Sequence, residues 1–153
     1  MIDSTRLLGS IITSDLRWEQ NTSHVVKKAN ARMELLRRVA SFGPKTDDLK
    51  NIYVLYVRSQ LEQNCVVWHS SLTEQDKNDL ERVQRSALKI ILGEGYESYT
   101  KALNTLNLVT LEERREYLCL NFARRCTKNE KTQKMFPLKS KVHNMETKTK
   151  TNL

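Results

Sequence analysis

The chain is poor in residues that interrupt helices, with only 4 glycines and 2 prolines among its 153 residues. Charged residues make up 29% of the sequence and hydrophobic residues 39%. Few breakers and many charges favour a helical protein, because glycine and proline both weaken helix interiors. Scarce glycine also leaves no Gly-rich phosphate-binding loop and no Gly-x-Ser-x-Gly elbow. We therefore expect no bound nucleotide cofactor and no small-molecule substrate.

Cysteine and histidine are scarce too, with three of each and no metal-binding spacing. Cys119 and Cys126 would lie about two turns, roughly 10 Å, apart on one helix, which is too far for a disulfide. Cys65 and His69 could share a helix face, but two ligands do not make a zinc site and no Cys-x-x-Cys is present. We expect reduced thiols in an intracellular protein, in the cytoplasm or nucleus, and no metal site.

Long hydrophobic runs are missing as well. None approaches the ~20 residues that a membrane-spanning helix needs. The N-terminal apolar stretch is short and broken, which argues against a signal peptide. We expect no membrane partner.

Positive charge is unevenly distributed along the chain, whose formal net charge is +8. Residues 17–41 hold six Lys or Arg against two Glu, and residues 130–153 hold six against two. Residues 42–109 are nearly balanced, with eight bases and nine acids. Such asymmetry suggests a polyanionic partner, although a solvated helix face with a disordered tail explains the charge equally well.

Apolar spacing predicts the first long helix from Trp18 onward. Apolar residues recur three and four positions apart, as one helix face requires, at Val26, Ala29, Met33, Leu36 and Ala40. Gly43 can adopt a left-handed cap and Pro44 prevents continuation, so the helix should end there.

Capping residues mark the later helices. Thr46 should cap a second helix, which continues to a break at Ser70-Ser71. This helix is apolar on all sides around residues 52–57 and is therefore expected to be central, and we place Trp18, Tyr53, Tyr56 and Trp68 in the core. A third helix should bury Leu80, Val83, Ala87 and Ile90. Thr73 with Asp76, and Thr110 with Glu113, resemble capping boxes for this helix, which ends at Gly93, and for a last helix that ends near residue 128. Residues 99–106 form a shorter helix between them.

These patterns predict an all-α fold, a small bundle of about five helices. Residues 6–12 could form a strand or a buried turn ahead of the bundle. We expect three parts: residues 1–16 as a short lead-in, 17–128 as the helical domain, and 129–153 as a disordered basic tail rich in Lys, Thr and Asn.

Exposed cations on the helices are the candidate functional residues. Phosphate contacts need only positive side chains at suitable spacing, and they produce binding with little sequence preference and strong salt dependence. Arg114 and Arg115 could line one side of the last helix together with the pair ten residues later. The nucleic-acid-binding candidates are Lys27, Lys28, Arg32, Arg37, Arg38, Arg124 and Arg125.

Catalytic residues are not expected in this chain. Two-metal phosphoryl-transfer chemistry needs carboxylates that hold two divalent metal ions about 3.5–4 Å apart. The only Asp-Asp pair, Asp47-Asp48, follows Thr46 at a predicted helix start, so we assign it to capping.

The block at residues 61–93, LEQNCVVWHSSLTEQDKNDLERVQRSALKIILG, resembles a segment of the reverse transcriptases of non-LTR (LINE-type) retrotransposons. In that family a VWHSSLT…LERVQRRALRIILG pattern recurs just past the polymerase palm. Weaker matches follow the family's order along nearly the whole chain, among them Leu8-Gly9, Leu16-Arg17-Trp18, Leu35-Leu36-Arg37-Arg38, Tyr56-Val57-Arg58, Met135-Phe136-Pro137-Leu138 and His143-Asn144-Met145. Ser10 and Val66 depart from the usual valine and proline.

This resemblance implies a thumb and post-thumb fragment of an RNA-directed DNA polymerase, with residues 1–16 at the palm-to-thumb junction. Such a part would hold the RNA–DNA template–primer, or RNA, beside an active site that it does not contain. Mg²⁺ would then belong only to the complete polymerase. A helical protein-interaction module and a non-functional retroelement remnant are the alternative interpretations.

Overall fold

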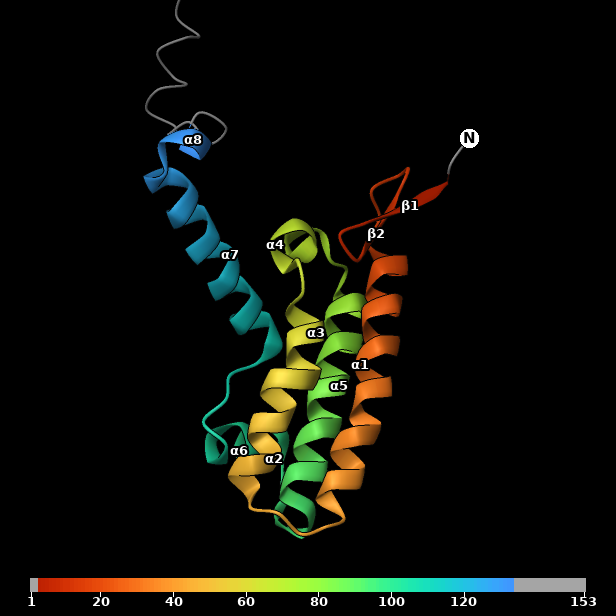
Figure 1. The fold of residues 1–153 in the computed structure, drawn as a ribbon, viewed down its shortest axis with the longest axis vertical. Helices are drawn as coiled ribbons and strands as arrows, with labels where there is room; N and C mark the ends of the chain where they lie inside the picture. The colour runs from red at the N-terminus through yellow and green to blue at the C-terminus, as the bar shows by residue number, and fades with distance from the viewer. Residues whose placement is uncertain (1–2, 134–153) are drawn as a thin grey trace, which may run out of the picture.

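The computed structural model describes residues 3–133, which form a mostly helical bundle with a small antiparallel sheet at its N-terminal end (Figure 1). This confirms the predicted all-α class and the strand-like lead-in. Among the described residues, no helix is both long and apolar enough to cross a membrane.

The lead-in is a β-hairpin made of β1 (Ser4–Leu7) and β2 (Ser10–Thr13). Its two-residue turn has positive φ at both positions, 48° at Leu8 and 88° at Gly9, which is the backbone geometry that suits a tight hairpin. The hairpin is fixed to the bundle by a hydrogen bond from the Ile11 backbone N–H to Asn21 Oδ1, 3.0 Å long.

Helix α1 (Glu19–Ala40) buries one face, but its centre differs slightly from the predicted stripe. Ala29, Met33 and Leu36 are fully buried as expected, whereas Val25 replaces Val26 as the innermost valine. Trp18, just ahead of the helix, is buried as predicted. The chain turns after the helix at Gly43, whose φ of 70° is the left-handed conformation expected there.

After this turn, three consecutive helical elements form one continuous segment, here called the second rod. They are α2 (Thr46–Ile52), the π-helical η1 (Tyr53–Arg58) and α3 (Ser59–Glu62). Thr46 was wrongly predicted as its cap: Lys45 precedes the helix in an extended conformation, and no side-chain cap bond is made. The π-helix widens the turn, so residues four apart remain on one face. The buried residues are therefore Leu49, Tyr53, Val57 and Leu61.

Two expectations for this rod were wrong. Leu55 is 76% exposed and Tyr56 is 42% exposed, so this rod is not buried on every side. The prediction that Tyr56 lies in the core was therefore wrong. Its neighbours α1 and α5 cover only one side of it (Figure 1). The predicted helix also stops early, because Asn64 adopts a φ of 55°, and a short helix α4 (Cys65–Trp68) and a 3-10 turn η2 (His69–Ser71) follow.

Helix α5 (Glu74–Leu92) packs against both α1 and α2, while α1 also contacts the second rod directly, and η3 (Gly93–Gly95) follows α5. The predicted capping box is confirmed: the Asp76 backbone N–H donates to Thr73 Oγ1, and the Thr73 N–H donates to the Asp76 carboxylate. Its inward face carries the predicted leucine, valine and alanine, with Ile91 deeper than the predicted Ile90. Trp68 packs in the core with 1% exposure, as expected.

Helices α6 (Tyr99–Thr105) and α7 (Leu111–Lys128) were predicted within one residue of their bounds. The capping box of Thr110 and Glu113 is confirmed. The first half of α7 packs on α4 and α5, and its second half extends past the end of the bundle (Figure 1). The short α8 (Glu130–Gln133) shows that the expected disorder does not begin at residue 129; residues 134–153 lie outside the described part.

Candidate nucleic-acid interface

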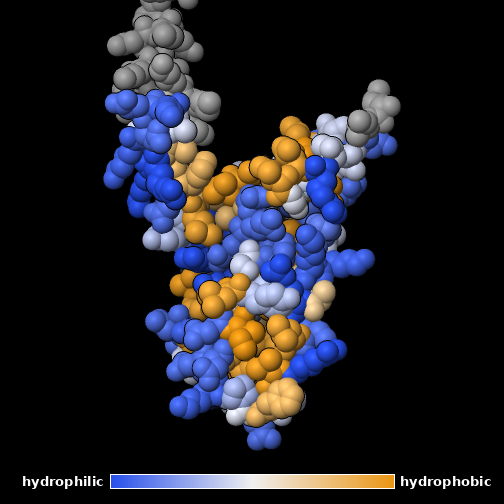
Figure 2. All heavy atoms as spheres, viewed as in Figure 1, coloured by the Kyte–Doolittle hydropathy of each residue, from blue (hydrophilic) through white to orange (hydrophobic). Residues whose placement is uncertain are grey.

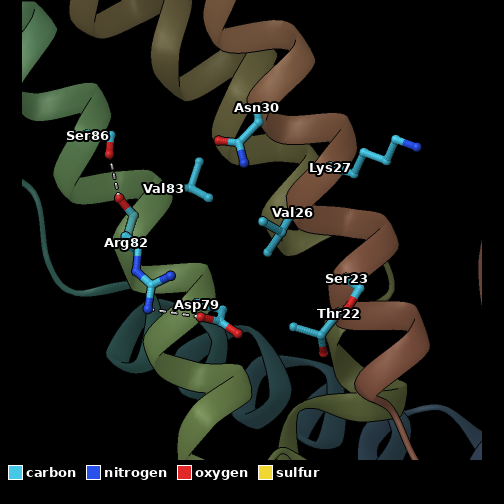
Figure 3. Close-up of a pocket in the computed structure, with 9 residues that line it drawn as sticks. All are labelled: Thr22, Ser23, Val26, Lys27, Asn30, Asp79, Arg82, Val83 and Ser86. Atoms are coloured by element: carbon cyan, nitrogen blue, oxygen red, sulfur yellow. Dashed lines mark hydrogen bonds and ion pairs between the residues drawn. The ribbon is translucent and has the colours of Figure 1, made fainter.

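Helices α1 and α5 pack directly on each other, and their exposed edges form a groove of about 650 Å³ (Figure 3). Both helices are long and regular, so each presents residues three and four apart along the same wall. The lining residues from α1 are Thr22, Ser23, Val26, Lys27 and Asn30, and those from α5 are Asp79, Arg82, Val83 and Ser86.

Seven of the nine lining residues have polar or charged side chains, and two valines, Val26 and Val83, lie between the helices (Figure 3). Arg82 pairs with Asp79 on its own helix at 3.2 Å, and Lys27 extends outward from the rim of α1 (Figure 3). The Ser86 hydroxyl donates to the Arg82 carbonyl, whereas Thr22 Oγ1 is buried and has no hydrogen-bond partner among the described residues. Hydrogen-bonding groups and cations of this kind suit a polar, anionic ligand.

The structure divides the five predicted cations of α1 into free and engaged ones. Lys27 and Lys28 are exposed, and neither makes an ion pair within residues 3–133. Arg37 and Arg38 both pair with Glu34, at 3.5 and 3.3 Å. Arg32 donates to the Tyr56 carbonyl at 2.7 Å and lies over the Tyr56 ring, so it holds η1 against α1.

A positive field surrounds the start of α1. Burial lowers the pKa of His24, and the nearby charges of Lys28, Arg6 and Lys27 lower it further. Arg6 comes from β1, so the hairpin adds a cation to this end of the helix. His24 is therefore neutral at pH 7, and the charge available to a polyanion comes from the lysines and arginines.

Arg82 was not among the predicted site residues. The block at residues 61–93 was expected to supply caps and core, whereas Arg82 lies on the outward side of its helix. The available signal was helical spacing: Asp79, Arg82 and Ser86 lie three and four apart and avoid the buried face. Which neighbour that side would meet depends on how α1 packs, and this is a tertiary property.

The predicted pair Arg124 and Arg125 does not join this groove. Both residues lie on the outer half of α7, on the opposite side of the molecule from α1 (Figure 1). Together with Lys128 they line a second cleft, between α4 and α7. Of the seven predicted cations, Lys27 lines the first groove and Arg124 and Arg125 line the second cleft, whereas the other four line neither.

Arg115 was wrongly predicted to lie on the exposed side of α7 with Arg124 and Arg125. It is fully buried, its Nε donates to His69 Nδ1 at 3.4 Å, and its guanidinium lies over the Trp68 ring at 5.9 Å. The capping box starts α7 at Leu111, and docking on α4 and η2 turns this position inward. Arg115 therefore serves packing at the base of α7.

The cysteines and carboxylates provide no further site. Within the described residues, no group of three or more Cys, His, Asp or Glu is placed to hold a metal ion. Cys65, Cys119 and Cys126 are all free thiols, as expected. Asp47 and Asp48 are exposed in the first turn of α2, where the helix dipole favours carboxylates, although neither makes a cap hydrogen bond.

Comparisons with protein families, with curated proteins and with solved structures found no match to this chain. Its function must therefore be inferred from its residues and from the geometry of the groove between α1 and α5.

Proposed function

We propose that this chain is a thumb-region fragment of a retrotransposon RNA-directed DNA polymerase that binds an RNA–DNA duplex without sequence preference. The proposal rests on the sequence resemblance and on one geometric observation. The groove between α1 and α5 is lined by two cations, Lys27 at its outer rim and Arg82 in its ion pair with Asp79. The exposed Ser23 hydroxyl and Asn30 amide lie on the same wall as Lys27. These groups are donors, and phosphate oxygens are acceptors.

The backbone of the duplex would supply most of the affinity. Each phosphate neutralised by a Lys or Arg releases condensed counterions, so binding weakens as salt rises, with a slope of about 0.9 per contact on a log–log plot. The hydroxyls and the Asn30 amide are suited to the 2′-hydroxyls that an RNA strand displays in its wide minor groove. Polymerase chemistry is not assigned to these residues.

Fluorescence anisotropy with a labelled RNA–DNA hybrid, measured across a salt series, tests the proposal. We expect submicromolar binding at low salt. Replacing Lys27 and Arg82 by Gln should make the slope shallower by about 1.8 and weaken binding about 60-fold at 0.1 M salt, if each contacts one phosphate.

Two matched variants sharpen this test. Lys101→Gln removes one charge on α6, far from α1 in Figure 1, and should leave hybrid binding unchanged. Replacing Arg124 and Arg125 by Gln removes the same number of charges as the groove variant, but from the other surface. Circular dichroism checks that every variant is folded. Absence of hybrid binding at low salt would refute the proposed function. If only the Arg124 and Arg125 variant lost hybrid binding, the groove between α1 and α5 would not be the duplex-binding surface.

A further inference from the structure

The outer half of α7 and the short helix α4 enclose a cleft of about 630 Å³ with an apolar floor. Val66 is 39% exposed and Phe122 is 46% exposed, and Leu118 lies half-buried between the cleft and the core. Figure 2 shows hydrophobic residues along the side of α7 that faces the hollow, continuing over the adjoining end of the bundle. Clustered apolar side chains of this kind mark interaction surfaces.

The uncompensated charge of this cleft is positive. Glu62, its one carboxylate, is occupied by Arg58 at 3.1 Å and by Arg114 at 3.2 Å. Lysine and arginine form the rim on the α7 side, and none of them makes an ion pair within residues 3–133. These rim residues are Arg124, Arg125 and Lys128.

We propose that this cleft is a docking site for an acidic amphipathic helix of another protein. Within residues 3–133, the main packing partners of α7 are α4, α5, η2 and α8, so a third helix could lie along its outer half and bury Val66, Leu118 and Phe122. Apolar anchors three and four residues apart would fill the floor, and flanking carboxylates would meet the arginine rim. This site is separate from the proposed duplex groove and does not depend on it.

Charge and shape disfavour three other occupants of this cleft: the C-terminal residues of this chain, a second copy of the chain, and a nucleic acid. Residues 134–153 of this chain carry five lysines and one glutamate, and a second copy would also be a net cation, so either would bring like charge to the rim. Nucleobases prefer flat aromatic platforms, whereas this floor offers one aromatic ring, Phe122, beside branched aliphatic side chains. An acidic amphipathic helix can place apolar side chains on the floor and carboxylates beside the basic rim.

The probe is a fluorescent peptide of about 18 residues, long enough to form a helix on binding, with leucines on one face and glutamates flanking it. Anisotropy with the full chain should give a dissociation constant on the order of 10 μM. Phe122→Ser should weaken binding about tenfold through loss of an anchor. Reversing Arg124 and Arg125 to Glu should weaken it by a similar factor or more.

Matched control variants distinguish specific docking in the cleft from non-specific binding of the peptide. Leu120→Ser changes a residue of similar exposure, 51%, on the same helix but outside the cleft, and Lys101→Glu reverses a charge on α6. Both should leave peptide affinity unchanged. A shuffled peptide, whose leucines no longer share a face, should bind at least tenfold more weakly.

Several results would overturn the assignment. Equal binding of the shuffled peptide would mean that charge alone is recognised. Binding of a uridine oligonucleotide but not of the peptide, sensitive to Phe122→Ser, would assign the cleft to RNA. Concentration-dependent self-association lost in Phe122→Ser would assign it to a second copy. Hybrid-duplex binding, measured separately with the Lys27 and Arg82 variant, distinguishes failure here from failure of the proposed function.

Discussion

Replacing Tyr53 by phenylalanine should lower the free energy of unfolding by about 2 kcal/mol, because its hydroxyl supplies a hydrogen bond that no water can replace. The Tyr53 hydroxyl donates to Gln84 Oε1 at 2.6 Å, and both residues are fully buried. Burial raises the pKa of Tyr53 well above its usual range, so the phenol remains a donor at all ordinary pH values.

Gln84 connects several elements, and for this reason the loss is not local. Its Nε2 donates to the Tyr99 hydroxyl at 2.8 Å and to the Val109 carbonyl at 3.0 Å, while Tyr99 donates to Glu81. Glu81 in turn accepts from the Leu111 backbone N–H, at the first residue of α7. The network thus fixes η1, α5, α6 and the start of α7 relative to one another.

The size of each loss in unfolding free energy depends on which buried polar groups the substitution leaves without a hydrogen-bond partner. Tyr53→Phe leaves one buried acceptor, Gln84 Oε1, without a donor, which costs about 1–3 kcal/mol. Gln84→Met leaves both the Tyr53 hydroxyl and the Val109 carbonyl unpaired, so it should cost more, about 2–5 kcal/mol. Both single substitutions remove the hydrogen bond between Tyr53 and Gln84. The double variant should therefore lose about 1–2 kcal/mol less unfolding free energy than the sum of the two single losses.

Urea unfolding followed by far-UV circular dichroism measures these values. The midpoint should fall while the slope stays constant, and the melting temperature should drop by about 4–8 °C for Tyr53→Phe. Tyr56→Phe is the matched control, because Tyr56 is exposed and its hydroxyl makes no hydrogen bond within residues 3–133. A Tyr53→Phe variant within about 0.5 kcal/mol of the parent, or no coupling with Gln84→Met, would refute the network.

Three further perturbations test the core and its titrating groups. Trp68→Ala should destabilise the chain by about 3–5 kcal/mol, measured by urea unfolding, since Trp68 is 1% exposed; a loss below about 1 kcal/mol would show that it is not core. Burial raises the pKa of the Cys65 thiol to about 12, so iodoacetamide at pH 8 should modify it only after unfolding; equal rates by mass spectrometry in folded and unfolded chain would contradict this. Burial and then Arg115 lower the pKa of His69 from 6.5, so the unfolded chain takes up the proton first and stability should fall as pH drops below 6.5; unfolding curves of His69→Gln should show a shallower fall, and an unchanged one would rule His69 out.

Local sequence signals correctly predicted the starts of α5 and α7 and the turn at Gly43, where a side chain or a glycine acts on its own backbone, but they misplaced the cap of α2 at Thr46. Thr73 with Asp76 and Thr110 with Glu113 each satisfy N–H groups within one turn, so their effect does not depend on the rest of the fold. The break at Asn64 was missed because its left-handed backbone is stabilised from far along the chain. Its amide donates to the Leu8 carbonyl and to Ser10 Oγ in the hairpin.

By itself, the sequence determined the helical class, the capped starts of α5 and α7 and the burial of Trp18 and Trp68, because composition, caps and apolar spacing act over a few residues. Only the tertiary structure decided which cations are available. Packing placed Lys27 and Arg82 on opposite walls of one groove, engaged Arg32 with Tyr56, and carried Arg124 and Arg125 to a separate cleft. Helical spacing gives the side of a helix on which a residue lies, but the neighbour that side meets is chosen by the packing of the whole chain.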